Sequence, residues 1–392
     1  MKVLLVGPWA PASLAFARSL RRRGIGTYLL QTGTGEYCAP RTLSVVEGAS
    51  TMPMTALGTE AGIALISTHA ERLRASAVAA ITDGELLWLG ENRSRFPPPC
   101  QVLVQAPELL AKLLSKQYQM ELAREAGLTV LPTYRLTQPD DANAIPAADW
   151  PLVLRPDRAG SVEPRFKVRL VDSLESLRTV IRECQRLEAP ILAQPYVRLP
   201  NLVVHGARST SGQVIASRCY DVPRKFEGLS LVIHPRAFPG RLEDLCHEFV
   251  TRANIQGCYH LEFLFSPSDS CAYFLEANVR LGGTTDKVVR TGFDEPALLL
   301  ESFGVIPKGT SHATATTRRV VNKRVVIKHI ARAAAGHLTA FDHPKANRLV
   351  HIAYSCRDLL LAKDSIFDWR DVSGSLRFHF RDLITRSPRG KE

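Results

Sequence analysis

The sequence lacks the cysteine patterns of zinc sites and disulfide frameworks. Eight cysteines are scattered over 392 residues, and no two of them form a CxxC pair. Paired, closely spaced cysteines are typical of structural zinc sites, and dense cysteines are typical of small secreted domains. We therefore expect reduced, mostly buried thiols in a cytoplasmic protein, and no zinc site.

Long hydrophobic runs are also missing. No stretch of 18 or more apolar residues occurs, although 45% of the residues are hydrophobic. Such a sequence fits a folded globular protein without a membrane-spanning helix. The start, MKVLLVGPWAPASLAFARSL, superficially resembles a signal peptide. We interpret KVLLVG instead as the first strand of a folded domain, because the residues after it suit a helix.

Several catalytic motifs are absent. The sequence has no GxSxG, HExxH or Walker P-loop pattern, and its first strand–helix turn, GPWAP, lacks GxGxxG. These motifs serve serine hydrolases, zinc proteases, P-loop nucleotide hydrolases and dinucleotide-binding enzymes. None of these chemistries is indicated.

Negative charge is scarce at the C-terminal end. The chain has a net charge of +12, and residues 310–392 contain 16 Lys and Arg against 7 Asp and Glu, which is +9 of that total. A solvated basic face explains this bias as well as a peripheral membrane surface or a partner protein does. Nucleic acid is a less favoured partner because no known binding module is present.

Strands and helices alternate along residues 1–105, which predicts a parallel sheet with crossover helices. RFPPPC near residue 97 is interpreted as a linker. Residues 106–192 mix helices with strands, and residues 193–309 carry antiparallel patterns such as the two strands around Ser211 and Gly212. In residues 310–392 we expect a strand over 323–331 and an amphipathic helix over 352–367.

The stretch LEFLFSPSDSCAYFLEANVR, residues 261–280, predicts a hairpin with its turn near Ser268 and Asp269. Alternation along the strands then places Glu262 almost opposite Glu276, with Asn278 on the same face. Like charges opposed on a sheet repel, and a bound divalent cation removes the conflict. Two carboxylates and an amide oxygen suit Mg²⁺ completed by phosphate oxygens. The alternative is an edge hairpin with two solvated glutamates.

HLEFLFS followed by YFLEANVRLGG resembles the signature of ATP-grasp enzymes. Other pieces follow in the same order: LLSKQYQMELAREAGLTVLPTY resembles a helix that begins with a phosphate-binding lysine. WPLVLRPDRAGS and PILAQPYV resemble the strands that bind phosphate and adenine. YDVPRKFEG is similar to a phosphate-contacting stretch of the D-alanine–D-alanine ligase branch. The resemblance covers roughly residues 1–308.

The resemblance implies an α/β and α+β fold in four parts. These are an N-terminal Rossmann-like pre-ATP-grasp domain (1–105), a small lobe (106–192), a large lobe with the metal site (193–309) and a basic C-terminal extension (310–392). It further implies an ATP- and Mg²⁺-dependent ligase that activates a carboxylate as an acyl-phosphate, which an amine or another nucleophile such as a thiol then attacks. A homodimer is a candidate assembly.

The resemblance assigns roles to individual residues. Glu262, Glu276 and Asn278 would bind Mg²⁺, or Mn²⁺ in its place. The residues expected to bind ATP are Lys116, Arg155, Gln194, Tyr196, Lys225 and Glu276. Arg280 would be the catalytic residue, facing the acyl-phosphate or its tetrahedral adduct.

Each ATP-binding assignment has a structural alternative. Lys116 could be an exposed helix lysine and Lys225 a loop lysine, while Gln194 and Tyr196 could be ordinary strand residues with adenine bound by backbone groups alone.

Three features depart from the family pattern. Arg155 stands where a lysine is usual, the covering loop DRAGSVEPRFKV has only one glycine, and Asn201 is the nearest residue to the usual ribose-binding glutamate. Arginine keeps the positive charge, but its planar fork needs more room. Arg155 and the bulkier loop leave a second hypothesis open, a non-catalytic nucleotide-binding or scaffold protein with this fold.

Overall fold

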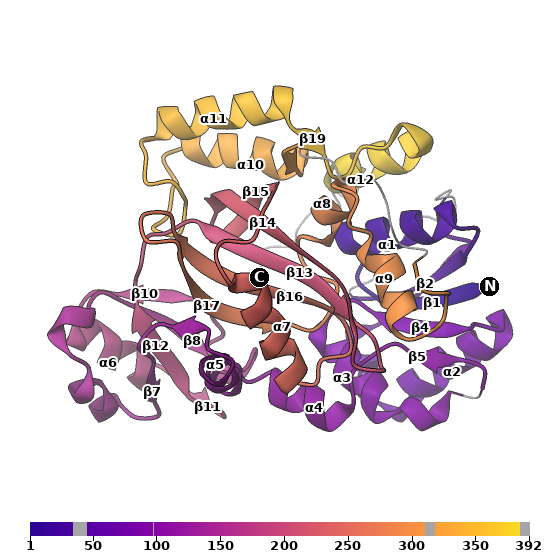
Figure 1. Cartoon of the computed structure of the whole chain (residues 1–392), viewed down its shortest axis with the longest axis horizontal. Coiled ribbons are helices and arrows are strands. Elements are labelled where there is room, and N and C mark those ends of the chain that lie inside the picture. The colour runs from indigo at the N-terminus through magenta and orange to yellow at the C-terminus, as the bar shows by residue number, and fades with distance from the viewer. Residues whose placement is uncertain (34–44, 97, 310–317, 385–392) are drawn as a thin grey trace.

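The computed structural model describes residues 1–33, 45–96, 98–309 and 318–384. Three sheets form the body of the molecule, and the chain ends on helices that cover one side of the largest sheet (Figure 1). This mixture of parallel and antiparallel sheets confirms the α/β and α+β fold class.

The first sheet is parallel, as the alternating pattern predicts, with strand order β3-β2-β1-β4-β5. Its strands are β1 (Lys2–Gly7), β2 (Gly26–Thr32), β3 (Gly48–Met52), β4 (Ala77–Ala80) and β5 (Gln101–Val102). Its helices are α1 (Pro11–Arg22), α2 (Glu60–Leu73) and α3 (Asp83–Glu91). The sequence did not reveal β3 or β5, because both are short and β3, GASTM, has neither β-branched alternation nor apolar bulk.

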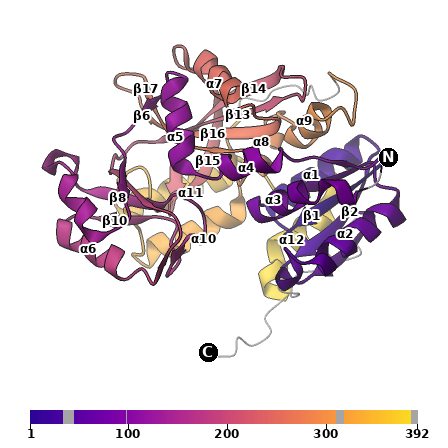
Figure 2. The ribbon, with the colours of Figure 1, turned by 90° about the horizontal axis from the view of Figure 1, so that it is seen from below.

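A smaller antiparallel sheet follows, with strand order β10-β8-β12-β7. Its strands are β7 (Tyr134–Leu136), β8 (Leu152–Pro156), β10 (Arg169–Val171) and β12 (Ile191–Pro195), and α6 (Leu174–Arg182) belongs to the same lobe. A two-stranded sheet of β9 (Val162–Glu163) and β11 (Arg186–Leu187) lies beside it. Helices α4 (Pro107–Leu113) and α5 (Lys116–Glu125) lead into this lobe, which Figure 2 shows apart from the first sheet.

The largest sheet has eight strands in the order β19-β18-β15-β14-β13-β16-β17-β6. They are β6 (Thr129–Val130), β13 (Asn201–Arg208), β14 (Val214–Phe226), β15 (Leu229–Arg236), β16 (Gly257–Ser266), β17 (Cys271–Asn278), β18 (Val320–Val321) and β19 (Lys363–Asp364). Strand β13 is buried along its whole length. Side chains from its two faces enter two different core clusters, because successive residues of a strand point to opposite faces.

Helices α7 (Leu242–Arg252), α8 (Thr285–Arg290) and α9 (Glu295–Ser302) pack on this sheet or against α1. None of the helices in the described ranges has both the length and the apolar character needed to cross a membrane. The seven cysteines within those ranges are free thiols, as expected, although only Cys219, Cys246 and Cys258 are fully buried. Cys38 lies outside the described residues.

The C-terminal segment corrects one prediction. Residues 323–331 are not a strand but part of helix α10 (Lys323–Ala334), which is capped by the Asn322 side chain. The β-branched run Val325–Val326 favours a strand locally, but Val326, His329 and Ala333 recur at helical spacing and are buried. Helix α11 (Arg348–Leu361) packs against α10 and confirms the expected amphipathic helix in part. It begins four residues earlier than expected and ends at Leu361 rather than at residue 367, because Lys363–Asp364 pair with β18 as a strand.

The segment is also joined to the large sheet. Strands β18 and β19 extend the sheet at one edge, and α12 (Val372–Ile384) follows. The Arg224 guanidinium of β14 is buried and donates to Asp358 and to Ser355 (2.6 Å), both of α11. The described part of the basic extension is therefore packed structure rather than a detached tail, while residues 310–317 and 385–392 lie outside the described residues.

This buried contact predicts a large stability effect. The substitution Arg224→Met should lower the free energy of unfolding by about 3 kcal/mol, because Asp358 would lose its closest cation inside the protein. Urea denaturation followed by circular dichroism measures this change. Arg252→Met, which removes the exposed pair with Glu248, should change it by less than about 1 kcal/mol. Equal effects of the two substitutions would contradict the prediction.

Candidate active site

The hairpin of β16 and β17 sets the geometry of the site. Glu262 and Glu276 are Cα partners across the two strands, and His260 is the partner of Asn278. The expected opposition of the two carboxylates is thus confirmed. A register shift directly after Glu262 interrupts the ladder there, as β-bulges commonly do next to functional sites.

The Glu276 carboxylate is held by Arg155 of the smaller sheet and by Asn278 of its own strand. The Arg155 guanidinium of β8 donates to Glu276 Oε2 and also to the Leu275 carbonyl (3.3 Å), while Asn278 Nδ2 donates to Glu276 Oε1 (3.3 Å). Burial raises the pKa of Glu276, but Arg155 and Lys116 outweigh it and lower that pKa to about 2. Glu276 therefore remains ionised without a bound metal.

Lys116 is the first residue of α5, where Ser115 caps the helix. Asp157, just beyond β8, accepts hydrogen bonds from Ser115 Oγ (3.0 Å) and from the backbone N–H of Gln117 (2.7 Å). The Lys116 ammonium reaches the Asp157 carbonyl (3.4 Å). Burial and the nearby Arg155 lower the pKa of Lys116. The lysine is thus a partly desolvated cation beside Arg155 rather than an exposed helix lysine.

Lys225 comes from β14 in the large sheet. Its ammonium donates to Asn201 Oδ1 (2.9 Å) and to the Leu199 carbonyl (3.1 Å). Burial lowers the pKa of Lys225 to about 8, although the charge of Glu262 opposes this shift. Asn201, the nearest candidate for a ribose ligand, is engaged with this lysine. Lys225 lies in a strand, so the alternative that it is a loop lysine does not apply.

Gln194 and Tyr196 lie at and just after the end of β12. Gln194 is buried and donates to Thr133 Oγ1 (3.0 Å), while the Tyr196 hydroxyl donates to the Ala340 carbonyl. The Tyr196 ring also meets Phe341 edge-on. Both side chains therefore contact protein groups, which favours backbone rather than side-chain contacts to an adenine ring at this strand.

Arg280 follows the hairpin and reaches the first domain. Its guanidinium donates to both carboxylate oxygens of Asp83, at 2.5 and 3.2 Å, and to Asn278 Oδ1 at 3.4 Å. Asp83 begins α3, just beyond the carboxyl end of β4. Asp83 was not among the residues expected from the sequence. An acidic residue directly after a parallel strand could have indicated it, because ligands of parallel sheets bind at the carboxyl ends of the strands.

Gln119 was also not found from the sequence, and it holds the end of β17. From α5 its side chain donates to the Ala277 carbonyl (2.8 Å) and accepts from the Ala277 N–H (2.8 Å). Ala277 lies between Glu276 and Asn278, beyond the point where β6 pairs with β17. Gln119 thus satisfies two buried backbone groups on the side of β17 that faces away from β16, where β6 no longer pairs. No local pattern distinguishes it from other glutamines on the helix.

A buried histidine pair lies behind Glu262. His260 Nε2 is 3.4 Å from Glu262 Oε1, and its ring stacks on His205 with the ring centroids 5.3 Å apart. His205 Nδ1 contacts the fully buried Glu295 (2.6 Å). Gly282 lies against His260, and a Cβ at that position would come within 2.2 Å of the ring. The glycine of the LGG sequence therefore permits the close approach of backbone to this ring.

The donor set fits a hard divalent cation. Glu262 and Glu276 supply carboxylate oxygens and Asn278 an amide oxygen, which are ligands that Mg²⁺ prefers. Within the described ranges, no cluster of three or more His, Cys, Asp or Glu side chains is arranged as a metal site. The described residues therefore do not form an all-protein cage, and a cation there would need ligands from a nucleotide or from water.

Comparison with solved structures identifies the fold. The chain matches N5-carboxyaminoimidazole ribonucleotide synthetase from Thermus thermophilus, with a TM-score of 0.62, 14% identity and 81% of each chain covered. The biotin carboxylase domain of 2-oxoglutarate carboxylase from Hydrogenobacter thermophilus matches at 0.59 and 16%, covering 77% of this chain and 69% of that one. The chain has the ATP-grasp fold.

The same fold occurs in L-amino acid ligase from Bacillus licheniformis, with a TM-score of 0.58, 16% identity and coverage of 77% of this chain and 74% of that one. No family model and no curated protein sequence matches the chain. The resemblance inferred from the hairpin and the ordered motifs is confirmed for the ATP-grasp fold. Residue identity is too low to carry an activity across.

The Gln119 contacts predict a local effect on β17. Gln119→Leu should leave the Ala277 N–H and C=O buried without partners, which costs about 2 kcal/mol of stability. It should also speed hydrogen exchange of the amides in β17, measured by mass spectrometry. Gln117→Leu removes only a contact with Glu121 on the same helix and should leave that exchange unchanged. Unaltered exchange in both variants would refute the positioning role.

The low pKa of Glu276 predicts a specific pH dependence. Its folded-state pKa, about 2, lies below the ordinary value of 4.5. The group therefore stabilises the folded state above pH 4.5, and this stabilisation disappears as the pH falls toward 2. Urea denaturation between these limits should show a shallower pH dependence for Glu276→Gln than for the native protein. Parallel curves would contradict the assignment.

Proposed function

We propose that the protein is an ATP- and Mg²⁺-dependent ligase that activates a carboxylate as an acyl-phosphate for attack by an amine or a similar nucleophile. The carrying observation is the opposed pair Glu262 and Glu276, countered by Arg155 of β8 and by Lys116 at the start of α5. The two carboxylates could bind a metal ion, and the neighbouring cations could bind phosphate oxygens, which together suit a nucleotide with its metal.

The phosphate-binding roles follow from position. Lys116, Arg155 and Lys225 approach the hairpin from α5, β8 and β14, and would neutralise the phosphate oxygens of ATP. Arg155 already donates to Glu276, so one guanidinium would touch both a metal ligand and a phosphate. Backbone groups of β12 at Gln194, together with Tyr196, would lie along the adenine.

Glu262, Glu276 and Asn278 would hold Mg²⁺, or Mn²⁺. A metal there would supply charge neutralisation for the phosphoryl group during its transfer. The carboxylate ligands come from two strands of one hairpin, and Gln119 holds the backbone between two of the ligands. This arrangement supplies the fixed positions that phosphoryl transfer requires.

Arg280 is the proposed catalytic residue. Its guanidinium lies next to Asn278 and is held by Asp83 of the first domain. From there it would bind the acyl-phosphate or the tetrahedral adduct formed when the nucleophile attacks. Phosphate then leaves with the electrons of the broken acyl–oxygen bond, and the amide forms. No side-chain nucleophile is required.

The matched structures support this class of reaction. Their names describe a synthetase, a carboxylase and a ligase, and the Hydrogenobacter thermophilus domain was solved as a dimer with MgADP, ADP and bicarbonate. We extend to this chain the use of ATP and magnesium, small carboxylate and amine substrates, and a homodimer as the candidate assembly. A peripheral membrane surface or a partner protein stays the proposed contact of residues 310–392.

A second candidate function is nucleotide binding without catalysis. The Arg155–Glu276 ion pair favours it, because this contact already neutralises a proposed metal ligand. ATP binding by calorimetry, together with no ADP formed over broad carboxylate and amine panels, would support this alternative.

The ligase proposal predicts magnesium-dependent release of ADP in the presence of a carboxylate and an amine. Glu276→Ala should lower this rate at least about 100-fold, because the metal and Arg155 would lose a common ligand. A coupled assay for ADP measures the rate. The control Glu125→Ala changes an exposed glutamate of α5 and should be neutral. Intact nucleotide binding and turnover in Glu276→Ala would overturn the site assignment.

A further inference from the structure

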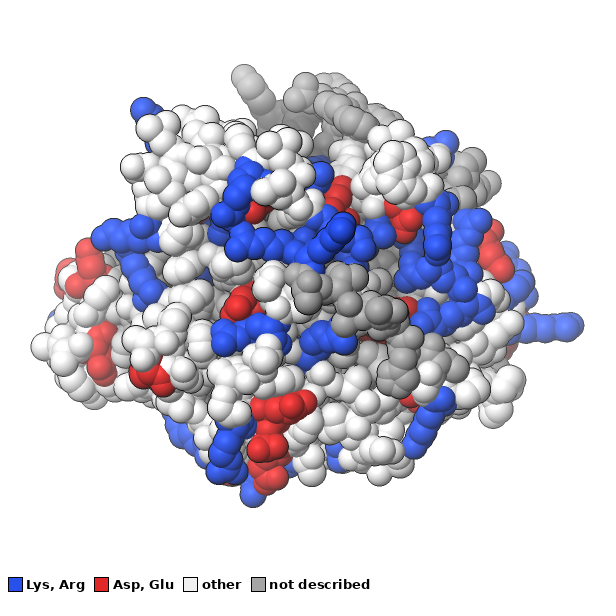
Figure 3. Space-filling model, turned by 45° about the horizontal axis from the view of Figure 1, so that its top comes forward, with Lys and Arg blue, Asp and Glu red and all other residues white. Residues whose placement is uncertain are grey.

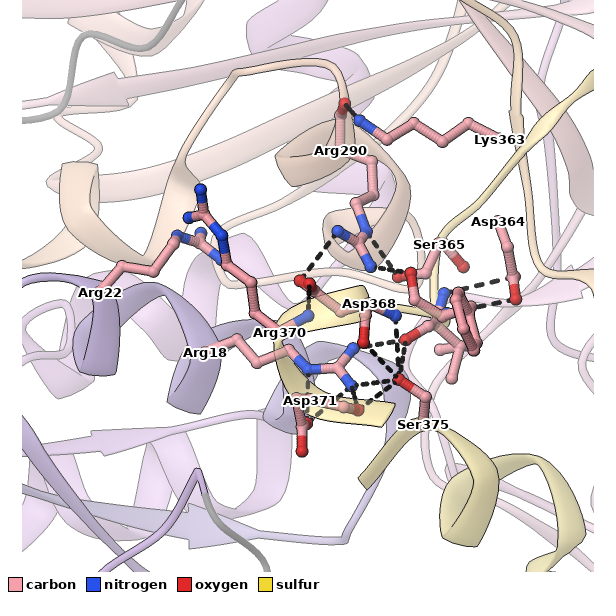
Figure 4. A network of polar contacts seen from close by, with 12 residues as sticks. Arg18, Arg22, Arg290, Lys363, Asp364, Ser365, Asp368, Arg370, Asp371 and Ser375 are labelled. Atoms are coloured by element: carbon pink, nitrogen blue, oxygen red, sulfur yellow. Dashed lines mark hydrogen bonds and ion pairs between the residues drawn. The ribbon is translucent and has the colours of Figure 1, made fainter. Parts of the chain in front are cut away.

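A cavity of about 390 Å³ lies away from the hairpin, where three segments distant in sequence meet. We call it the α1–α8 cavity. Its lining comes from the second half of α1, from α8 and the turn after it, and from residues 363–370. Figure 4 shows these side chains converging from separate elements. The volume falls in the range of small-molecule sites.

The lining is rich in cations. It contains Arg18, Arg22, Arg23, Arg290, Lys363 and Arg370, against Asp286, Asp294 and Asp368. The surface turned forward in Figure 3 likewise carries more blue Lys and Arg than red Asp and Glu. An excess of one charge sign in a concave site attracts ligands of the opposite sign.

Part of this charge is used to hold the fold together. Arg18 donates to Asp371 (2.8 Å), Arg290 to Asp368 (3.0 Å) and Arg23 to Asp294 (2.6 Å). These pairs tie α1 and α8 to the C-terminal segment and to the turn before α9. Asp286 has its own neighbour, Lys287, at 3.8 Å.

Three cations of the lining, Arg22, Lys363 and Arg370, have no acidic side chain of their own once these ion pairs are assigned. Arg22 only shares Asp294, at 3.8 Å, with the closer Arg23. Lys363 donates to a backbone carbonyl, that of Arg290. Arg370 has no ion pair with an acidic side chain in the described ranges, and all three cations are exposed at the mouth of the cavity. Ion pairs within the fold thus account for the positions of Arg18, Arg23 and Arg290, but not for those of the three exposed cations.

Two buried oxygens of the lining have no hydrogen-bond partner among the described residues, Ser365 Oγ and Asp286 Oδ2. Both atoms are withdrawn from the open side of the cavity, and the second belongs to a carboxylate. Neither therefore indicates an anion, and the case for one rests on the three exposed cations.

The electrostatics agree with this arrangement. Burial, followed by the charges of Arg290 and Arg318, lowers the pKa of Lys363. Burial also lowers the pKa of Arg22, and Arg23 adds to that effect, while Asp294 opposes it. A bound anion would relieve the repulsion between these cations.

We propose that the α1–α8 cavity binds a phosphate group between Arg22, Lys363 and Arg370. Phosphate matches the planar guanidinium donors of Arg22 and Arg370 and the compact ammonium of Lys363. The ligand is a phosphorylated small molecule or the headgroup of an anionic lipid, since both present the same group. The site is separate from the proposed ATP site and does not depend on catalysis.

Calorimetric titration with inorganic phosphate and with pyrophosphate tests the proposal. The full chain is used with Lys116→Ala in the background, so that the proposed nucleotide site contributes little, and chloride keeps the ionic strength equal. Saturable binding is expected. The double substitution Lys363→Ala with Arg370→Ala should weaken it about tenfold or more, because it removes two charge-assisted contacts.

The matched control is Lys112→Ala, an exposed lysine of α4 outside the cavity, which should leave the affinity unchanged. Flotation with phosphatidylcholine vesicles, with and without phosphatidic acid, tests the lipid source. Flotation that requires phosphatidic acid and Lys363 with Arg370 assigns the site to a headgroup, while soluble binding alone assigns it to a metabolite. If neither probe binds, or both bind the double variant as well as the native protein, the proposal is wrong.

Discussion

The opposition of Glu262 and Glu276 is the constraint around which the candidate site is arranged. Two like charges on neighbouring strands are unfavourable, and more so when partly withdrawn from water. Arg155 and Lys116 relieve this in the structure. Arg155 belongs to the smaller antiparallel sheet, so its contact with Glu276 joins that sheet to the hairpin, whereas Lys116 begins a helix that packs against β17. The proposed sites for phosphate and metal lie where these cations meet the two carboxylates.

Helix α5 performs several tasks in this arrangement. Its N-terminus places Lys116, its next turn places Gln119 against Ala277, and Asp157 fixes the start of the helix to the end of β8. Hydrogen bonds between side chains and backbone groups thus link the start of α5 to the end of β8 and to β17. Such links orient ligands more firmly than exposed ion pairs, because partly buried hydrogen bonds lose less to competition with water.

The C-terminal segment is held to the rest of the fold by buried ion pairs. Adjacent residues of β14 point in opposite directions, so Arg224 clamps α11 while Lys225 points toward Asn201 and Glu262. Arg18 and Arg290 fasten the first domain and α8 to residues 365–371. Two of the basic residues of the C-terminal segment, Lys363 and Arg370, line the α1–α8 cavity, while others such as Lys328, Lys345 and Arg348 are exposed elsewhere. The amino-acid composition gives the number of charged residues, but it does not show which of them form ion pairs in the folded chain.

The sequence predicted the parallel first sheet, the hairpin and the residues Glu262, Glu276 and Asn278 that share its face. Those features depend on strand alternation and on order along the chain, which are local properties. It predicted a strand where α10 forms, and it did not reveal Asp83, Asp157 or Gln119. Each of these depends on a partner more than 30 residues away, so no window of neighbouring residues contains the signal.

The amino-acid sequence by itself determined the ATP-grasp motif order and the pairing that sets two carboxylates against each other, because pleat and register follow from residue spacing. Only the tertiary structure decided which cations meet those carboxylates, which glutamine holds the strand between them, and which basic residues around the C-terminal segment are left without an acid of their own. Electrostatic partners act through space, and the folded chain alone brings them within hydrogen-bonding distance.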